Sequence, residues 1–198
     1  MDSQELADFK ADLRKEAFAV REAAWRAAPD AGEALRQRLI EALAMPPGIA
    51  ISGYWPLPGE IDVRPALLHY HAEGHPIGLP VVTGKNEPLI FRRWNPAVAL
   101  VQGSFRVMTP PAEAPEVRPT ILLVPLLAFD PEGYRLGYGG GFYDRTLAKL
   151  RSDVHAVAVG VAYAVQEVPM VPRGAFDQPL DYIVTERAIF KFDKRNES

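Results

Sequence analysis

Two uninterrupted apolar runs constrain the fold of this chain more than any other feature of its sequence. Residues 120–124 read Thr-Ile-Leu-Leu-Val, and residues 155–162 read His-Ala-Val-Ala-Val-Gly-Val-Ala. A strand without alternating polar positions has no solvent-facing side, so such runs are typical of a parallel sheet that is covered on both faces. The sequence therefore predicts two buried strands in the middle of a sheet.

Helical and strand-like segments alternate along the rest of the chain. Residues 3–28 lack glycine and proline, and Pro29 follows them. Asp30 and Glu33 have the spacing of a capping box for a second helix, which Pro-Pro-Gly at 46–48 would close. The apolar residues at helical spacing in the first helix are Leu6, Phe9, Leu13, Val20 and Ala24. Two more helices are expected, one between Asp62 and Gly74 and one over residues 142–150. Short strands are expected over residues 49–55, 77–82, 89–94, around 105–108, and over 120–124, 155–162 and 182–185. The last of these strands would precede a C-terminal helix or tail.

This order of elements indicates the fold class. Helices that alternate with short apolar strands are typical of α/β proteins. We expect a three-layer α/β/α sandwich with a largely parallel central sheet, Rossmann-like in organisation, as a single domain over residues 1–198. The proline-rich residues 110–119 are short enough to be a loop within that domain.

Composition and charge exclude several classes of protein. With 198 residues and 48% hydrophobic content, the chain is long enough to bury a sizeable core. A net charge of −3 argues against a general nucleic-acid binder, which would be strongly basic. The absence of cysteine excludes disulfides, thiolate chemistry and Cys-based zinc sites. The acidic residues 1–5 do not resemble a signal peptide, and no apolar run approaches the ~20 residues that span a bilayer, so we expect a cytoplasmic protein without membrane contact.

A glycine-rich segment is the strongest functional signal. Residues 135–145 read Arg-Leu-Gly-Tyr-Gly-Gly-Gly-Phe-Tyr-Asp-Arg. Exposed N–H groups that lead into a helix form a cradle for anions. Asp144 would repel a phosphate unless a cation lay between them, so the segment indicates a magnesium-bound nucleotide. It is not a Walker A loop, because no Gly-Lys-Ser/Thr follows it. It is not a dinucleotide fingerprint either, because Phe142 stands at the position of the third glycine. The structural alternative is a mobile hairpin whose glycines only satisfy turn geometry.

The first helix carries a second candidate feature, a stripe of cations. Lys10, Arg14 and Arg21 share a narrow sector of one helix face, and none has a carboxylate three or four positions away. A solvated basic face and an anionic ligand explain this stripe equally well.

Carboxylates and an aromatic residue complete the candidates. Asp144 and Asp181 could bind magnesium, which takes one or two carboxylates and fills its octahedron with phosphate and water. Trp55 and Glu60 flank the turn after the first expected strand, where α/β proteins often bind ligands, and they would suit a flat heterocycle with N–H donors. The structural alternatives are a turn residue for Asp181, a packing tryptophan and a surface glutamate. The four histidines form no convincing site.

Six segments together resemble one enzyme family. They are Lys10-x-x-Leu13-Arg14, residues 54–62, Phe91-Arg-Arg-Trp94, the approach Val-Pro-Leu-Leu-Ala-Phe-Asp at 124–130, the glycine-rich residues 135–145 and Leu-Asp-Tyr-Ile-Val-Thr at 180–185. In this order they resemble the 5-formyltetrahydrofolate cyclo-ligase family, also called methenyltetrahydrofolate synthetase, over nearly the whole chain. The sequence departs from the family pattern at Phe176, where many members have histidine, and over residues 103–110.

The resemblance implies a reaction and a set of partners. It implies ATP- and Mg²⁺-dependent cyclisation of 5-formyltetrahydrofolate to 5,10-methenyltetrahydrofolate, with release of ADP and phosphate after phosphorylation of the formyl oxygen. The implied partners are small molecules, ATP and a reduced folate, and we expect a monomer that contacts neither nucleic acid nor membrane. Such chemistry depends on positioning and charge neutralisation and needs no protein nucleophile.

The resemblance also implies roles for individual residues. ATP would be bound by Lys10, Arg14, Arg135, Leu136, Gly137, Tyr138, Gly139, Gly140, Gly141, Phe142 and Tyr143. The folate would be bound by Trp55, Glu60, Tyr138, Gly139, Gly140, Gly141 and Phe142. The metal would be bound by Asp144 and Asp181. Lys10, Arg14 and Arg145 would be catalytic, because they would stabilise charge on the transferring phosphoryl group.

Other readings of the sequence remain open at this point. A sugar-phosphate isomerase or a CoA-transferase-like enzyme on a similar scaffold would bind phosphate without ATP hydrolysis. A nucleotide-sensing or folate-binding protein would bind its ligand without turnover. Arg92, Arg93 or neither could hold the tail of a folate.

Overall fold

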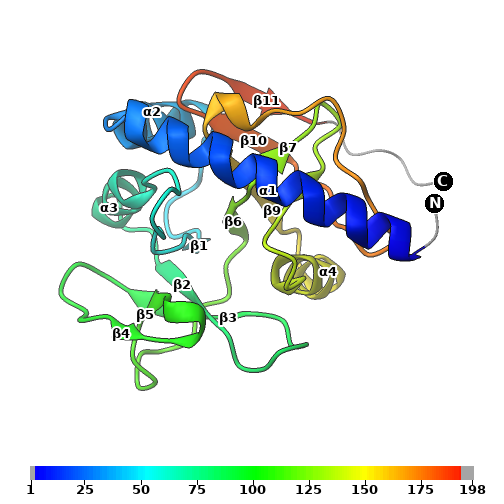
Figure 1. The fold of residues 1–198 in the computed structure, drawn as a ribbon. Helices are drawn as coiled ribbons and strands as arrows, with labels where there is room; N and C mark the ends of the chain where they lie inside the picture. The colour runs from blue at the N-terminus through cyan, green and yellow to red at the C-terminus, as the bar shows by residue number, and fades with distance from the viewer. Residues whose placement is uncertain (1–2, 193–198) are drawn as a thin grey trace.

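A seven-stranded sheet forms the centre of the molecule (Figure 1). The computed structural model describes residues 3–192. The strands lie in the order β11-β10-β9-β6-β1-β2-β3. Their bounds are β1 Ile51–Ser52, β2 Ile77–Val81, β3 Ile90–Trp94, β6 Ile121–Pro125, β9 Val157–Ala162, β10 Tyr182–Thr185 and β11 Ile189–Lys191. From β10 to β2, each strand pairs in parallel with the next strand in this order. The edge strands β11 and β3 pair antiparallel with β10 and β2. The predicted largely parallel sheet is confirmed.

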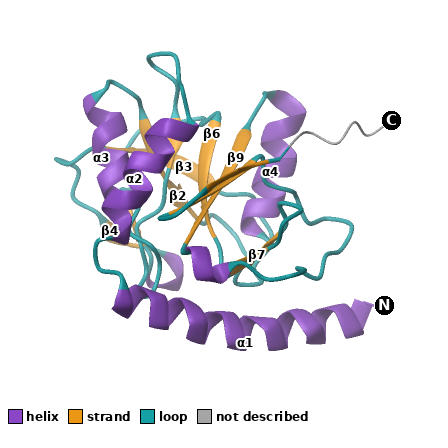
Figure 2. Cartoon of the chain, turned by 90° about the horizontal axis from the view of Figure 1, so that it is seen from above, coloured by secondary structure: helices purple, strands orange, loops and turns teal. Residues whose placement is uncertain are grey.

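Helices cover both faces of this sheet (Figure 2). On one face, Leu123 of β6 packs in a core with Leu39 of α2 and Leu67 of α3. On the other face, Leu122 packs in a second core with Leu147 of α4. Successive residues of β6 thus face opposite layers, which is why the run at 120–124 is apolar throughout. The helices span Ser3–Ala27 for α1, Ala31–Ala42 for α2, Arg64–Ala72 for α3 and Phe142–Asp153 for α4. The predicted three-layer α/β/α arrangement is confirmed.

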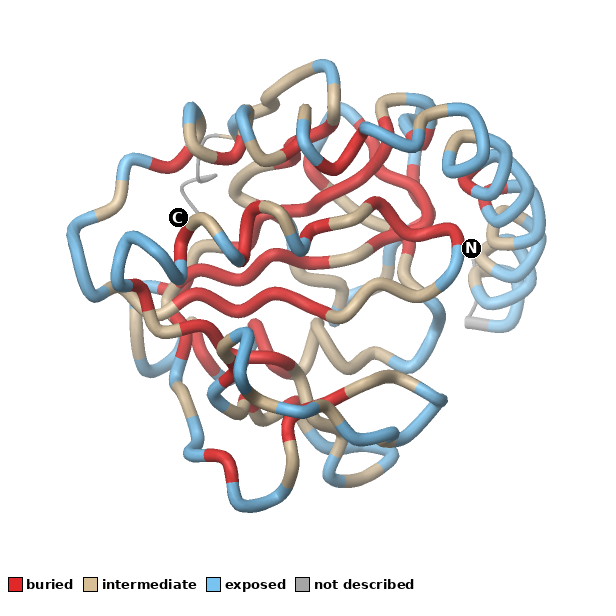
Figure 3. Tube along the Cα trace, turned by 90° about the vertical axis from the view of Figure 1, so that its left-hand side faces the viewer, coloured by how far each residue is buried: buried red, intermediate tan, exposed pale blue. Residues whose placement is uncertain are grey.

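The long helix α1 lies outside these layers and crosses one end of the sheet (Figure 2). It packs through Ala17 on a small core that includes Leu127, Leu136 and Val171. Two of these residues belong to or precede the hairpin of β7, Ala128–Phe129, and β8, Arg135–Leu136. This packing sets α1 against loops that follow the carboxyl ends of the central strands. In Figure 3 the strands are buried along most of their length, whereas the outer side of α1 is exposed.

The predicted start of the second helix is wrong in its detail. Asp30 is the N-cap residue of α2, but its side chain makes no capping hydrogen bond. The carboxylate of Glu33 instead binds Arg36 one turn later, with Nη2 2.5 Å from Oε1. The helix ends at Ala42, ahead of the Pro-Pro-Gly sequence that was expected to close it.

Two predictions about strands also need correction. The expected strand around 105–108 is a 3₁₀ turn, η1 Ser104–Arg106, between the short strands β4 Val101–Gln102 and β5 Met108–Thr109, because Phe105 and Arg106 have φ of 55° and 61°. Left-handed residues cannot continue a strand. Tyr182–Thr185 is not the last strand, since the Thr185 hydroxyl accepts hydrogen bonds from the N–H groups of Arg187 and Ala188, and this turn leads into β11.

Candidate active site

One cavity of about 770 Å³ lies between α1 and the loops at the carboxyl ends of the strands. Its walls are α1, the loop after β1, the glycine-rich segment after β8 and the hairpin of β4 and β5. Ligands of open α/β sheets bind in this position, and the volume lies within the usual range for small-molecule sites. The predicted residues that line the cavity are Lys10, Arg14, Trp55, Glu60, Arg135, Leu136, Gly137, Tyr138, Gly139, Gly140, Gly141, Phe142, Tyr143 and Asp144. Asp181 and Arg145 do not line it.

The glycine loop, residues 137–141, needs glycine for both conformation and space. Gly139 and Gly141 have φ of 97° and 65°, values that side chains disfavour. A Cβ atom at Gly139 would lie 3.3 Å from the guanidinium of Arg14. Gly141 is the N-cap residue of α4 and makes no side-chain cap, so the loop delivers backbone N–H groups to the start of a helix. The loop is therefore suited to an anion.

The cationic stripe of α1 faces this loop. Arg14 Nε donates to the carbonyl oxygen of Gly137 at 2.9 Å, and Arg21 Nη1 donates to the hydroxyl of Tyr138 at 2.5 Å. Lys10 lies one turn earlier and also lines the cavity. Burial lowers the pKa of Arg14, and the nearby charge of Asp177 acts in the opposite direction. The stripe is therefore turned toward the site and not toward solvent.

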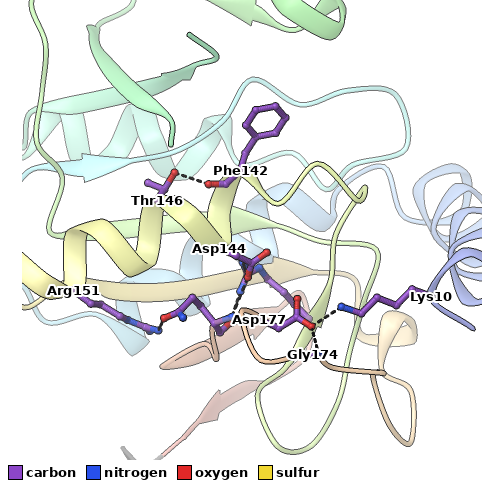
Figure 4. Close-up of polar contacts among 9 residues, drawn as sticks. Lys10, Phe142, Asp144, Thr146, Arg151, Gly174 and Asp177 are labelled. Atoms are coloured by element: carbon purple, nitrogen blue, oxygen red, sulfur yellow. Dashed lines mark hydrogen bonds and ion pairs between the residues drawn. The ribbon is translucent and has the colours of Figure 1, made fainter. Parts of the chain in front are cut away.

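Two carboxylates line the cavity beside the glycine loop, and each is held by a cation (Figure 4). Asp144 Oδ1 accepts hydrogen bonds from Arg135 Nη2 at 2.7 Å and from the N–H of Gln178. Asp177 Oδ2 lies 2.5 Å from Lys10 Nζ and also accepts the N–H of Gly174. The sequence did not indicate Asp177 as a site residue. Its neighbour Phe176 was indicated only as a departure from the family pattern. Its ion pair with Lys10, 167 positions away, identifies it in the structure.

The structure does not bring Asp181 to the cavity. Its Oδ2 accepts a hydrogen bond from Arg151 Nη2 at 2.8 Å and another from the N–H of Ala158 at the same distance. These bonds join the segment before β10 to β9 and α4. Asp181 therefore supports the sheet, while Asp177 lies in the cavity.

Arg135 is a buried cation at the floor of the cavity. Its side chain is 5% exposed, and Nη1 donates to the carbonyl oxygen of Gln178 at 2.5 Å. Burial lowers the pKa of Arg135, and Asp144 opposes this effect through its charge and hydrogen bond. The guanidinium of Arg135 is therefore held by two partners, Asp144 and the carbonyl oxygen of Gln178.

Arg145 supports the glycine loop from outside the cavity. Its Nη2 donates to the carbonyl oxygens of Gly140 at 2.8 Å and of Lys85 at 3.3 Å. Its guanidinium also lies 5.2 Å from the ring centroid of Phe142. In this conformation Arg145 holds the loop and does not face the ligand space.

The wall formed by the loop after β1 combines an aromatic face with a buried carboxylate. Trp55 packs edge-on against Trp94, with ring centroids 5.8 Å apart. Glu60 is 6% exposed, accepts the N–H of Leu57 at 2.8 Å on Oε2 and accepts the hydroxyl of Tyr138 at 2.5 Å on Oε1. Burial raises the pKa of Glu60, whereas these two hydrogen bonds and the charge of Arg21 lower it.

An aromatic residue that the sequence did not single out closes the cavity on its outer side. Phe105 of η1 is 69% exposed, and its ring packs edge-on against Phe142 with centroids 5.8 Å apart. Its left-handed backbone could not be foreseen, because phenylalanine at φ of 55° is uncommon.

The described residues contain neither a membrane-spanning helix nor a cluster of metal-binding side chains. No helix within residues 3–192 is both long enough and apolar enough to cross a membrane. Over the same residues, no cluster of three or more His, Cys, Asp or Glu side chains could hold a metal ion. A metal at the two cavity carboxylates would therefore need further ligands from a substrate or from water.

Comparisons with known proteins give a consistent answer. The sequence pattern of the 5-formyltetrahydrofolate cyclo-ligase family matches residues 6–186. The 5-formyltetrahydrofolate cyclo-ligase of Escherichia coli (strain K12) is 33% identical over 139 residues, which are 68% of this chain and 76% of that protein. The protein of the same name from Haemophilus influenzae is 35% identical and covers 66% of this chain and 72% of its own length.

Solved structures agree with the sequence comparisons. The structure of Aquifex aeolicus 5,10-methenyltetrahydrofolate synthetase superposes with a TM-score of 0.73 and 32% identity, covering 96% of each chain. A 5,10-methenyltetrahydrofolate synthetase from Mycoplasma pneumoniae shares the fold, with a TM-score of 0.71 and 24% identity over 89% of this chain and 98% of that one.

Proposed function

The chain belongs to the 5-formyltetrahydrofolate cyclo-ligase family and is an enzyme that converts 5-formyltetrahydrofolate to 5,10-methenyltetrahydrofolate, and from that premise we propose how its residues do so. The cavity binds ATP and the folate next to each other. The terminal phosphoryl group of ATP passes to the formyl oxygen, and ring closure then expels it as phosphate.

The observation that carries this proposal is the meeting of two distant segments in one cavity. Lys10 and Arg14 come from the start of the chain, and the glycine loop comes from residues 137–141. Together they present cations and backbone N–H groups, the two features that bind phosphate groups. Trp55 and Glu60 line the same cavity, where a flat heterocycle would face a carboxylate acceptor.

The chemistry needs charge stabilisation more than it needs a protein nucleophile. The formyl oxygen attacks the terminal phosphorus, the bond from that phosphorus to the bridging oxygen breaks, and ADP leaves. The second folate nitrogen then attacks the activated carbon, and phosphate leaves with the former formyl oxygen. Lys10, Arg14 and Arg135 stabilise the phosphate charge in this scheme, as fixed cations do in other phosphoryl transfers. Arg145 contributes by holding the loop through the carbonyl oxygen of Gly140.

Magnesium fits the carboxylates of the cavity. Asp144 and Asp177 both line it, and a magnesium site takes one or two carboxylates, with substrate phosphates and water as the other ligands. We therefore place the metal at Asp144 and Asp177. Asp181 is a less suitable ligand, because Arg151 and the N–H of Ala158 already bind its Oδ2. When bound, the ion would neutralise charge on the phosphate oxygens.

The two cations that pair with these carboxylates then gain a second role. Lys10 is paired with Asp177, and Arg135 is paired with Asp144. If a divalent ion takes over the carboxylates, both cations become available to phosphate oxygens. The two ion pairs thus hold Lys10 and Arg135 beside the proposed phosphate site without leaving their charges unpaired.

The wider expectations belong to the same proposal. We propose that residues 1–198 act as one domain and as a monomer in the cytoplasm, on small molecules and without nucleic acid. The one seven-stranded central sheet supports a single domain, and the charge of −3 argues against a nucleic-acid partner. Sedimentation of the purified chain tests the monomer directly.

One assay tests the proposed use of ATP. The purified chain is supplied with 5-formyltetrahydrofolate, ATP and magnesium, and methenyl absorbance is followed together with ADP release. We expect one ADP for each methenyl product. Product formed without ADP would refute the phosphorylation step, and ATP consumption without an absorbance change would indicate a different reaction.

A further inference from the structure

Arg21 is a buried cation for which the proposed reaction has no task. It is 4% exposed, and it does not line the cavity. Its Nη1 lies 3.7 Å from Glu60 Oε1, which is the only carboxylate that pairs with it among residues 3–192. Its Nε is buried without a hydrogen-bond partner in the described part of the chain. A buried guanidinium that is incompletely hydrogen-bonded is a poor source of stability, so its placement calls for another explanation.

The hydrogen bonds around Arg21 have a fixed direction. A guanidinium can only donate, so the hydroxyl of Tyr138 accepts from Arg21 Nη1 and gives its own proton to Glu60 Oε1. Oε2 of Glu60 accepts the N–H of Leu57. A carboxylate has about four acceptor positions. Two of them are thus occupied by the protein, and Glu60 lines the cavity with acceptor capacity left for a ligand.

Among residues 3–192, Arg21 is also the only cation whose charge acts on this carboxylate. The groups that act on Glu60 are Arg21 from α1, Tyr138 from the glycine loop, Tyr143 from the first turn of α4 and Tyr54 from the segment after β1. Burial raises the pKa of each of these three tyrosines, so they stay neutral. Positive charge that favours the ionised form of Glu60 therefore comes from Arg21 alone.

We propose that Arg21 is a positioning residue for the folate half of the site. Through Tyr138 it fixes the carboxylate of Glu60 and keeps it ionised, as an acceptor for N–H donors of the folate heterocycle. This inference rests on the proposed function of the cavity. It predicts that Arg21 affects the folate more than ATP, although Arg21 shares a helix face with Lys10 and Arg14.

The test is a kinetic comparison of Arg21→Met with the matched control Arg26→Met. Arg26 lies on the same helix, is exposed and pairs only with Glu22 in the described chain. In Arg21→Met we expect the KM for 5-formyltetrahydrofolate to rise about tenfold at neutral pH, while the KM for ATP changes less than about twofold. The acidic limb of kcat/KM for the folate should move upward by about one pH unit, because Glu60 then ionises later. Arg26→Met should behave as the wild type.

Two further variants guard against a loss of folding. Tyr138→Phe removes one oxygen from a residue that is 43% exposed, and it should raise the folate KM in the same direction. Arg21→Lys restores the charge and should return the acidic limb toward its wild-type position. Folded Arg21→Met or Tyr138→Phe protein with an unchanged folate KM and pH profile would overturn the inference, as would an equal rise in both KM values. A wild-type chain that makes no methenyl product would instead refute the proposed function.

Discussion

At the scale of single residues, the cavity pairs each of two cations with a carboxylate. Lys10 holds Asp177 (Figure 4), and Arg135 holds Asp144. In the proposed mechanism, the same two carboxylates would supply oxygen ligands for a divalent ion. Binding of that ion would then release Lys10 and Arg135 for phosphate oxygens.

A pair of aspartate variants tests which carboxylate serves the metal. Asp177→Asn should raise the magnesium concentration for half-maximal activity by roughly tenfold or more, because it removes a ligand of the ion. Asp181→Asn should lower the melting temperature, since it leaves Arg151 without its carboxylate, but it should keep the wild-type magnesium dependence. Magnesium titrations of both variants, with thermal denaturation alongside, make the comparison. A shift in Asp181→Asn only would restore the ligand that the sequence suggested.

The sequence predicted the roles of some of these residues but not of others. Lys10, Arg14 and the glycine loop could be found because their spacing is regular over a few positions. Asp177 could not be assigned a role, and Arg21 was predicted only as a member of the cationic stripe, because their functions depend on partners that are 167 and 117 positions away. Periodicity within one helix or one loop carries no information about such pairs.

At the scale of elements, the glycine loop is the part of the site with the least tolerance for change. Gly139 has φ of 97° and touches Arg14, whereas Gly137 lies in the same loop with an ordinary φ and with nothing within 4 Å of a Cβ atom. Position 139 therefore requires glycine for its backbone conformation and its space, whereas position 137 requires it for neither.

Alanine at these two positions gives a matched comparison. Gly139→Ala should lower the free energy of unfolding by roughly 1–2 kcal/mol and should weaken ATP binding, because the loop must shift away from Arg14. Gly137→Ala should stay within about 0.5 kcal/mol of the wild type and keep its ATP affinity. Chemical denaturation and ATP titration measure both effects. Equal behaviour of the two variants would mean that the loop conformation does not govern nucleotide binding.

The first helix shows why hydrophobic spacing can locate an element without giving its orientation. Its apolar residues correctly predicted a helix, yet Phe9 and Val20 are 45% and 43% exposed. The inward face also carries Lys10, Arg14 and Arg21, because this helix covers one side of the cavity as well as the small core around Ala17. Local conformation follows from spacing, whereas the face that turns inward follows from what lies opposite.

At the scale of the whole molecule, the fold was the most predictable feature. The continuous apolar runs at 120–124 and 155–162 indicated central strands, since only a sheet covered on both faces hides every residue of a strand. The antiparallel edge strand β11 was missed, because it depends on the turn at Thr185 and on the packing of Phe190 against Phe129. The edge strand β11 therefore depends on contacts that the apolar runs of the central strands do not predict.

Buried tyrosines make the stability of the molecule sensitive to alkaline pH. Burial raises the pKa of Tyr54, Tyr70 and Tyr143 above the ordinary value and raises the pKa of Tyr163 to about 12. The folded chain thus keeps protons that the unfolded chain releases above about pH 10. Stability that is present below that pH should be lost as the pH rises, by up to about 1.4 kcal/mol per pH unit for each such tyrosine.

Thermal denaturation between pH 8 and about 12 measures this loss. Tyr70→Phe provides the comparison, because the Tyr70 hydroxyl is buried without a hydrogen-bond partner among residues 3–192. This variant should be at least as stable as the wild type at neutral pH and should lose stability less steeply in alkali. An unchanged alkaline slope would show that Tyr70 ionises equally in the folded and unfolded states.

The central claim is that the cavity transfers a phosphoryl group from ATP to the formyl oxygen of the folate. Its most direct test is a reaction with 5-formyltetrahydrofolate that carries ¹⁸O in the formyl group, with the released phosphate analysed by mass spectrometry. The account predicts one ¹⁸O atom in each phosphate, formed together with one ADP. Phosphate without the label, accompanied by labelled water or labelled formate, would contradict it.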